Sequence, residues 1–244
     1  MNPPNQPREE IRAKLGLGVP GGAPGDDGKI KDPSAPPEGW YSRGYLPHYN
    51  KRQTLQSVTF RLADAMPQCK LRQIEKELAG TPAEKMNAAR RKQIEAWLDT
   101  GIGCCALSHP ALASLMRENL LKWDGDRYHL YAWCIMPNHV HVLMMTCAAL
   151  SRIVQSWKSF TGRWALEKNA ELGLGVPGKA LWMREYWDRY IRDPDHFDNV
   201  RHYIEQNPVA AGLCAKAADW PWSSVSASLP GKAEPQLGEN HTTR

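Results

Sequence analysis

The sequence lacks both a long apolar run and a leader-like start. Its longest apolar stretches, around residues 130–145, are too short and too often interrupted by polar residues to span a bilayer. The opening residues MNPPNQPREE lack the basic-then-apolar pattern of a secretory signal. These absences predict a soluble, cytoplasmic protein rather than a membrane or secreted one.

Paired cysteine motifs are also missing. The chain has six cysteines but no C-x-x-C pair, and Cys104 and Cys105 are adjacent, which suits neither a zinc knuckle nor a small disulfide scaffold. We therefore expect free thiols in a reducing compartment.

A large excess of one charge is absent as well. The formal net charge is +5 and the isoelectric point is about 8.9. This balance favours polyanions as partners without the surplus of a histone-like protein. Charge alone does not identify the partner.

The composition changes along the chain. Residues 1–40 are dense in Pro, Gly and charge with almost no aromatic anchor, so we expect a disordered arm there and a disordered tail over residues 229–244. Residues 41–228 should form one domain, because a chain of 244 residues can bury one substantial core.

Residue periodicity predicts the elements of this domain. In chain order they are a strand at 56–63, one or two helices within 67–98 capped at Thr81-Pro82, a helix from Pro110 to about Lys122, strands at 128–136 and 139–145, a helix from Leu150, an extended segment at 181–193, and a helix from Pro194 that stops at Asn207-Pro208. The tight Pro137-Asn138 connection predicts an antiparallel pair. The fold expected is α+β and ferredoxin-like (RRM-like), with helices on one face of an antiparallel sheet.

The stretch MPNHVHVLMM, residues 136–145, places two histidines in an apolar strand. A period of two sends His139 and His141 to one face, while Val140 and Val142 point to the other. Two neighbouring imidazoles can chelate one divalent ion. The alternative is that one or both are ordinary core or surface histidines, and the spacing alone does not decide between these readings.

Further motifs give the pair a context. The strand with HVH is followed by WKSFT in the next helix, then by REYWDRYIRD, YIEQNPVAAGL and WPWSS. In this order, over residues 40–226, the chain resembles the REP-associated tyrosine transposases, a branch of the single-tyrosine HUH (His-hydrophobe-His) insertion-sequence transposases (IS200-like). Five motifs together are far more specific than any one of them.

The resemblance implies an active site. It implies a divalent ion held by His139 and His141, and a nucleophilic tyrosine four residues before the NPV-AGL signature, which is Tyr203 here. Related enzymes have a third ligand one helical turn later, which is Asn207 here, although a plain helix C-cap is the alternative. Imidazole with an amide oxygen suits Mg²⁺ or Mn²⁺, and zinc would prefer thiolates.

Two other tyrosines compete for the role of nucleophile. Tyr186 and Tyr190 lie among arginines in REYWDRY, but their alternation with Trp182 and Trp187 suits a sheet or a base-stacking surface.

The partner implied is single-stranded or hairpin DNA with REP-like sequence, held by cations and aromatic rings. The candidate contacts are Arg43, Arg152, Lys158, Arg163, Arg184, Arg189 and Arg192. For each of them a solvated face or a surface ion pair is the alternative. We expect the WPW segment at 220–222 to anchor the C-terminal part of the domain onto the sheet.

The resemblance thus predicts a metal-dependent single-strand DNA endonuclease and strand transferase that works through a 5′-phosphotyrosine intermediate. A domesticated protein that binds REP-like hairpins without cutting is the second reading, and a phosphoesterase that activates water without tyrosine is the third. The resemblance also implies a bacterial, nucleoid-associated protein. A monomer is slightly favoured over a dimer, because no long apolar edge strand requires a partner.

Overall fold

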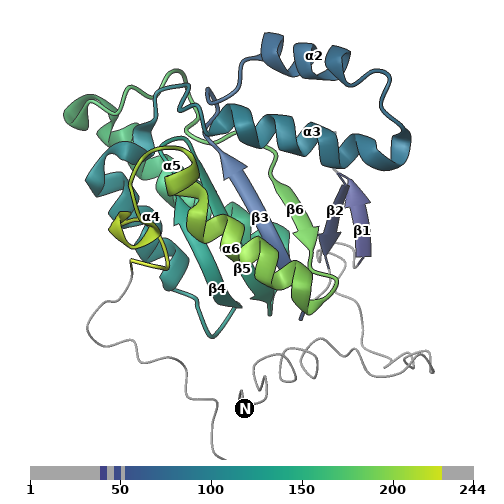
Figure 1. Ribbon diagram of the computed structural model, residues 1–244. Coiled ribbons are helices and arrows are strands. Elements are labelled where there is room, and N and C mark those ends of the chain that lie inside the picture. Colours follow the sequence, from purple (N-terminus) through teal and green to yellow (C-terminus); the bar gives the residue numbers. More distant parts are fainter. Residues whose placement is uncertain (1–38, 43–46, 51–52, 227–244) are drawn as a thin grey trace, which may run out of the picture.

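The computed structural model describes residues 39–42, 47–50 and 53–226 (Figure 1). The predicted arm, except its last two residues, and the predicted tail lie outside these ranges, as does Arg43. All six cysteines lie within them and are free thiols, as predicted. Among the helices of the described part, none is long and apolar enough to cross a membrane.

A four-stranded antiparallel sheet forms the centre of the fold. Its strands are β3 (Leu55–Arg61), β4 (Tyr128–Ile135), β5 (His139–Thr146) and β6 (Trp187–Tyr190), in the spatial order β4-β5-β3-β6. The predicted α+β class and antiparallel pairing are confirmed, and the histidine pair lies on a central strand, as expected. A separate hairpin, β1 (Gly39–Ser42) and β2 (Pro47–Asn50), stands beside the β6 edge in Figure 1.

Helices cover both faces of the sheet, so the prediction of helices on one face is wrong. In the part of the chain that the structure describes, the α-helices are α2 (Gln68–Glu77), α3 (Ala83–Leu98), α4 (Pro110–Leu121), α5 (Leu150–Leu172) and α6 (Pro194–Ala210). Helices α4 and α5 bury their apolar residues against one face in the main core. Helix α6 crosses the other face over β4 and β5, where a second apolar cluster joins Phe197 and Ile204 to Leu143 (Figure 1).

The alternation of β5 explains why two cores form. Val140, Val142 and Met144 point into the α4–α5 core, while Leu143 packs under α6. His139 and His141 share the α6 side with Leu143 because successive side chains of a strand alternate. Burial of apolar groups on both sides of β5 therefore fixes which way the imidazoles face.

Two helix ends differ from the prediction. Thr81 does not cap α3, because Pro82 occupies the N-cap position and no side chain caps the helix. Helix α6 starts as predicted, with the Asp193 carboxylate accepting from the His196 amide at 2.7 Å. It does not stop at Asn207-Pro208, however, since Pro208 removes only one amide within the last turn and the Ala211 amide still donates to the Asn207 carbonyl at 2.9 Å.

The C-terminal segment of the domain is anchored on the sheet by its tryptophans, as predicted. The Trp220 indole donates to the Ile135 carbonyl at 3.0 Å, and the Ile135 amide donates to the Trp222 carbonyl at 2.8 Å. This segment therefore covers the outer edge of β4, which would otherwise expose unpaired backbone groups.

Candidate active site

The two histidines of β5 face each other inside the molecule. Their Nε2 atoms are 2.9 Å apart, and each side chain is about 1 % exposed. The rings stand nearly perpendicular, at 89°. Two ring nitrogens bound at about 2.1 Å to one ion can lie about 3 Å apart, so this separation suits a shared cation.

Hydrogen bonds orient both rings. The Asn138 side-chain oxygen accepts from Nδ1 of His139 at 2.7 Å, and the Asn207 amide donates to Nε2 of His141 at 3.2 Å. Nδ1 of His141 lies 2.9 Å from the Thr59 hydroxyl and donates to it. Each Nδ1 therefore carries the proton and each Nε2 presents a lone pair, which is the arrangement that second-shell partners give to metal-binding histidines.

Burial keeps both histidines neutral. It lowers the pKa of His141 to about 4. The pKa of His139 is also lowered well below its usual value, first by burial and then by His141. Neutral imidazole is the form that binds metal, so the pair is ready to act as a ligand at physiological pH.

Helix α6 brings Tyr203 and Asn207 to the pair. The ring centroids of Tyr203 and His141 are 5.5 Å apart, and Tyr203 is 38 % exposed. Asn207, one turn further along α6, is buried. The continuous helix thus places a phenol and an amide on the same face, both next to the histidines.

The other two tyrosines point away from the histidines. Tyr186 belongs to the α4–α5 core, where its ring faces the Lys158 ammonium. Tyr190 pairs with Gln56 on β3, a position that alternation sends to the α5 side of the sheet. Of the three candidates, Tyr203 alone lies beside the imidazoles.

Helix α3 closes the site from the other side. No motif in the sequence predicted this, because residues 83–98 have only the pattern of a polar helix. Asp99 caps its C-terminus, with Oδ1 3.7 Å from Nε2 of His139. Glu95 lies one turn earlier and Arg91 is 3.8 Å from it. Burial raises the pKa of Asp99 to about 6, and it also raises the pKa of Glu95, against the opposing effects of Arg91 and the Tyr203 hydroxyl.

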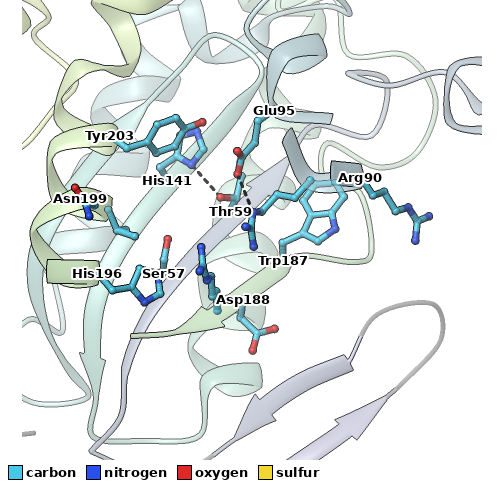
Figure 2. Close-up of a pocket in the computed structure, with 13 residues that line it drawn as sticks. Ser57, Thr59, Arg90, Glu95, His141, Trp187, Asp188, His196, Asn199 and Tyr203 are labelled. Carbon is cyan, nitrogen blue, oxygen red and sulfur yellow. Dashed lines mark hydrogen bonds and ion pairs between the residues drawn. The ribbon is translucent and has the colours of Figure 1, made fainter. Parts of the chain in front are cut away.

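A pocket of about 560 Å³ opens between β3, β6, α3 and α6 (Figure 2). Its walls combine an aromatic ring, several cations and the phenol. The lining residues are Ser57, Thr59, Arg90, Arg91, Glu95, His141, Trp187, Asp188, Arg189, His196, Asn199, Val200 and Tyr203. In Figure 2, Tyr203 and His141 lie together on one side of the pocket, and Glu95 lies across from them.

The predicted DNA contacts are spread over both faces of the protein. Arg189 lines the pocket, while Arg184 and Arg192 are exposed beyond the two ends of β6. Arg152 and Arg163 are exposed on α5, across the sheet from the histidines.

Lys158 is not available as a DNA contact, which corrects the prediction. Its ammonium donates to the backbone carbonyls of Met183, Arg184 and Glu185 at 3.0–3.2 Å. Burial lowers its pKa to about 7. Lys158 therefore fixes the segment that leads into β6 and has no donor left for a phosphate.

The donor set fits a hard divalent cation only if an oxygen joins the imidazoles. In the part of the chain that the structure describes, no three side chains of His, Cys, Asp or Glu form a ready metal cluster. The Asn207 side-chain oxygen is buried without a hydrogen-bond partner among the described residues. A half-turn of this amide would direct that oxygen, in place of the nitrogen, toward His141.

Comparison with known proteins gives the same family as the motifs. Residues 110–207 match the model of the family described as "Transposase IS200 like", a span from the start of α4 to Asn207. A Haemophilus influenzae protein (strain ATCC 51907 / DSM 11121 / KW20 / Rd) named as a REP-associated tyrosine transposase is 29 % identical over 118 residues. The match covers 45 % of this chain and 65 % of that protein, so the chain spans just under two thirds of its relative.

Among solved structures, a REP-associated tyrosine transposase bound to a REP hairpin aligns with 75 % of this chain and 83 % of its own, at 16 % identity and a TM-score of 0.45. The resemblance predicted from the sequence motifs is confirmed by the family model and the H. influenzae relative: over residues 110–207 the chain is similar to the IS200-like transposases.

Proposed function

We propose that this protein is a single-strand DNA endonuclease and strand transferase whose nucleophile is Tyr203, acting on REP-like hairpins. The observation that carries the proposal is the position of the phenol, 5.5 Å from His141 on the wall of an arginine-lined pocket. The family match adds support, since the matched span ends at Asn207 and includes both histidines and the tyrosine.

His139, His141 and Asn207 would hold the divalent ion, Mg²⁺ or Mn²⁺. When bound, the ion supplies Lewis-acid polarisation of the scissile phosphate and stabilises charge on the departing oxygen. Thr59 and Asn138 keep the two Nε2 lone pairs directed at one point. The protein's contribution is thus a fixed pair of neutral donors in a buried place.

Tyr203 requires help to become a nucleophile. Burial raises its pKa above the ordinary value, and the nearby carboxylates of Glu95 and Asp99 raise it further. The phenol is therefore protonated at rest. We assign Glu95 as the base that receives this proton, because the Tyr203 hydroxyl interacts with the Glu95 carboxylate and both line the pocket.

The reaction then balances without a further reactant. The Tyr203 oxygen forms a bond to phosphorus, the phenol proton passes to Glu95, and the bond from phosphorus to the 3′-oxygen breaks. The 3′-oxygen leaves with its electron pair and takes a proton from solvent water, while Glu95 returns the phenol proton to the solvent. The products are a 5′-phosphotyrosine and a free 3′-hydroxyl. Because the phosphodiester energy is kept in the adduct, another strand's 3′-hydroxyl can attack it and rejoin the DNA.

The pocket suits the nucleotide next to the cut. The Trp187 ring offers a flat face for an unstacked base, and its indole also contacts the Arg61 guanidinium at 5.4 Å. Arg91 and Arg189 would pair with backbone phosphates, as cations in such grooves do. Sequence-independent affinity would come from these contacts and specificity from the hairpin.

A covalent-adduct assay tests the proposal against a hairpin binder that does not cut. Wild type, Tyr203→Phe and Tyr190→Phe are incubated with a labelled single-stranded REP-like hairpin and its flanks, with Mn²⁺ or EDTA, and run on a denaturing gel. We expect a Mn²⁺-dependent adduct in wild type and Tyr190→Phe, and at least about a 10³-fold loss in Tyr203→Phe. Hairpin binding without an adduct in any protein would replace the proposal with the binder, and cutting that survives Tyr203→Phe would point to activated water.

A further inference from the structure

Asp99 occupies a place that its surroundings do not explain. It follows the last residue of α3, and its amide donates to the Glu95 carbonyl at 3.0 Å. Its Oδ1 atom is buried, and among the described residues it finds no hydrogen-bond partner. A buried carboxylate oxygen without a partner is costly, so a role for it should be sought in what lies next to it.

The neighbour of Asp99 is a lone pair rather than a proton. Its Oδ1 lies 3.7 Å from Nε2 of His139. Nδ1 of that histidine donates its hydrogen to the Asn138 side-chain oxygen, so Nε2 faces Asp99 with a lone pair. The contact is therefore neither an ion pair nor a hydrogen bond, and the two electron-rich atoms repel each other unless a cation lies between them.

Two side chains with an unpartnered oxygen lie next to the histidine pair. Asp99 approaches from α3 and Asn207 from α6, and Oδ1 of each is buried without a partner in the described part of the chain. Between them stand the two Nε2 atoms, 2.9 Å apart. The Asn207 nitrogen faces His141 at 3.2 Å, so its oxygen would join the site only after the half-turn of the amide. Asp99 Oδ1, by contrast, already faces Nε2 of His139, and a cation between these two atoms would satisfy both.

The backbone holds Asp99 close to the pair. The Asn138 side-chain amide donates to the carbonyls of Leu98 and Ile102 at 3.1 and 3.0 Å. Those two carbonyls flank Asp99 in the chain, so the turn before β5 clamps the end of α3 directly against His139. Among the described residues the carboxylate does not yet close a three-residue cluster with the histidines. Its side chain is 26 % exposed, so it is less tightly enclosed than the two imidazoles.

We propose that Asp99 is a fourth ligand of the divalent ion and that its carboxylate favours Mg²⁺ or Mn²⁺ over softer metals. The inference rests on the proposed function, because it takes the ion to sit on His139 and His141. One carboxylate adds a hard, negative oxygen to two imidazoles and an amide, and that charge is the feature that a neutral His-His-amide set lacks.

Direct metal binding tests this independently of cutting. Metal-stripped full-length wild type, Asp99→Asn and the matched control Asp219→Asn are titrated with Mn²⁺ by calorimetry and by the loss of the free-ion electron spin resonance signal. Asp219 is exposed on the short turn Ala217–Asp219. We expect Asp99→Asn to weaken Mn²⁺ binding about 10- to 100-fold or more, and Asp219→Asn to bind like wild type. Equal affinity of Asp99→Asn and wild type would overturn the inference.

Thermal unfolding separates a ligand from a structural residue. In EDTA, Asp99→Asn should melt no lower than wild type, since the change removes a buried charge that lacks a partner, and only the rise in Tm caused by Mn²⁺ should shrink. A lower Tm in EDTA would instead mean that the carboxylate supports the fold, and the inference would fall.

A further variant distinguishes this inference from the function on which it rests. His139→Ala/His141→Ala should lose Mn²⁺ binding. If wild type itself bound no Mn²⁺, the metal part of the proposed function would fail together with the role of Asp99. If wild type bound Mn²⁺ and Asp99→Asn bound it equally well, only the role of Asp99 would fail.

Discussion

The site has two walls, and only one of them can be recognised from sequence motifs. We call β5 with α6 the motif wall, and helix α3 with Asp99 the α3 wall. One wall, β5 and α6, carries its functional residues as motifs and lies within the span that matches the transposase family model. The other wall is α3, which lies before that span, belongs to no motif, and still brings Arg91, Glu95 and Asp99 to the same pocket region. A family motif can therefore identify one half of a site while the position of the other half depends on tertiary packing.

The difference has a physical origin. His139 and His141 share a face of β5 because side chains alternate along a strand, and Tyr203 and Asn207 share a face of α6 because they are one helical turn apart. Both relations depend only on neighbouring positions in the sequence. Asp99 meets His139 only because the Asn138 turn binds the end of α3, a contact across 40 positions of the chain. Local spacing cannot predict such a contact.

Protonation of His141 on the motif wall should make the free energy of unfolding depend on pH. The pKa of His141 is about 6.5 in the unfolded chain, whereas burial lowers the pKa of the folded residue to about 4. Its contribution is therefore present above pH 6.5 and is lost as the pH falls toward 4, which lowers the free energy of unfolding by about 3 kcal/mol. Urea denaturation in EDTA at pH 7 and at pH 4.5 measures this.

The control for this measurement is His129→Gln, a change at an exposed histidine of β4. It should keep the wild-type pH dependence, while His141→Gln should reduce it and leave the part due to His139, whose pKa burial also lowers. A wild-type unfolding free energy that does not change between these pH values would show that the histidines are not shielded, and the contrast between buried motif wall and open pocket would be lost.

The α3 wall should reveal itself in the rate of adduct formation. Glu95→Gln removes the base proposed for Tyr203, so we expect the covalent adduct to form about 10²-fold more slowly while Mn²⁺ affinity stays as in wild type. Single-turnover gel kinetics and a Mn²⁺ titration on the same sample measure both quantities.

Glu118→Gln provides the matched control, since Glu118 is exposed on α4 across the sheet from the pocket. An unchanged rate in Glu95→Gln would assign proton removal to the motif wall alone. Asp99 and Glu95 lie one helical turn apart, yet their variants should behave differently. Asp99→Asn should lose Mn²⁺ affinity, whereas Glu95→Gln should lose reaction rate and keep its Mn²⁺ affinity.

The smallest effect is expected at Trp187, which lies between the two walls. Trp187→Leu removes the proposed base platform and should weaken binding of a short single strand by about 1–3 kcal/mol. Fluorescence anisotropy with a labelled oligonucleotide checks this, with Trp164→Leu on α5 as the control. Equal affinity in both variants would place the strand elsewhere on the protein.

Much of the fold was predictable because its signals are local. The strands 128–136 and 139–145, their antiparallel pairing and the start of α6 at Asp193-Pro194 all follow from alternation and turn chemistry. The prediction failed where tertiary packing decides. Helix α6 lies on the opposite face from α4 and α5 because Phe197 and Ile204 find a second apolar surface on β4 and β5, which no periodicity reveals.

The same division holds for the candidate site. Strand alternation predicted the face that the two histidines share, whereas Tyr203 and Asn207 were named from the resemblance to the transposase family. The sequence also suggested Lys158 as a DNA contact, although three backbone carbonyls accept hydrogen bonds from its ammonium. It missed Thr59 and Glu95 because nothing near them in the sequence marks them as different from other strand and helix residues.

The Asn138 turn has a consequence for how this protein could vary. Asn138 binds α3 through backbone carbonyls and not through side chains, so it senses the path of residues 98–102 rather than their identity. Side chains there could be exchanged freely as long as the chain keeps its course. A one-residue insertion in the same place would carry the carboxylate of Asp99 away from the histidines while every motif of the sequence stayed intact.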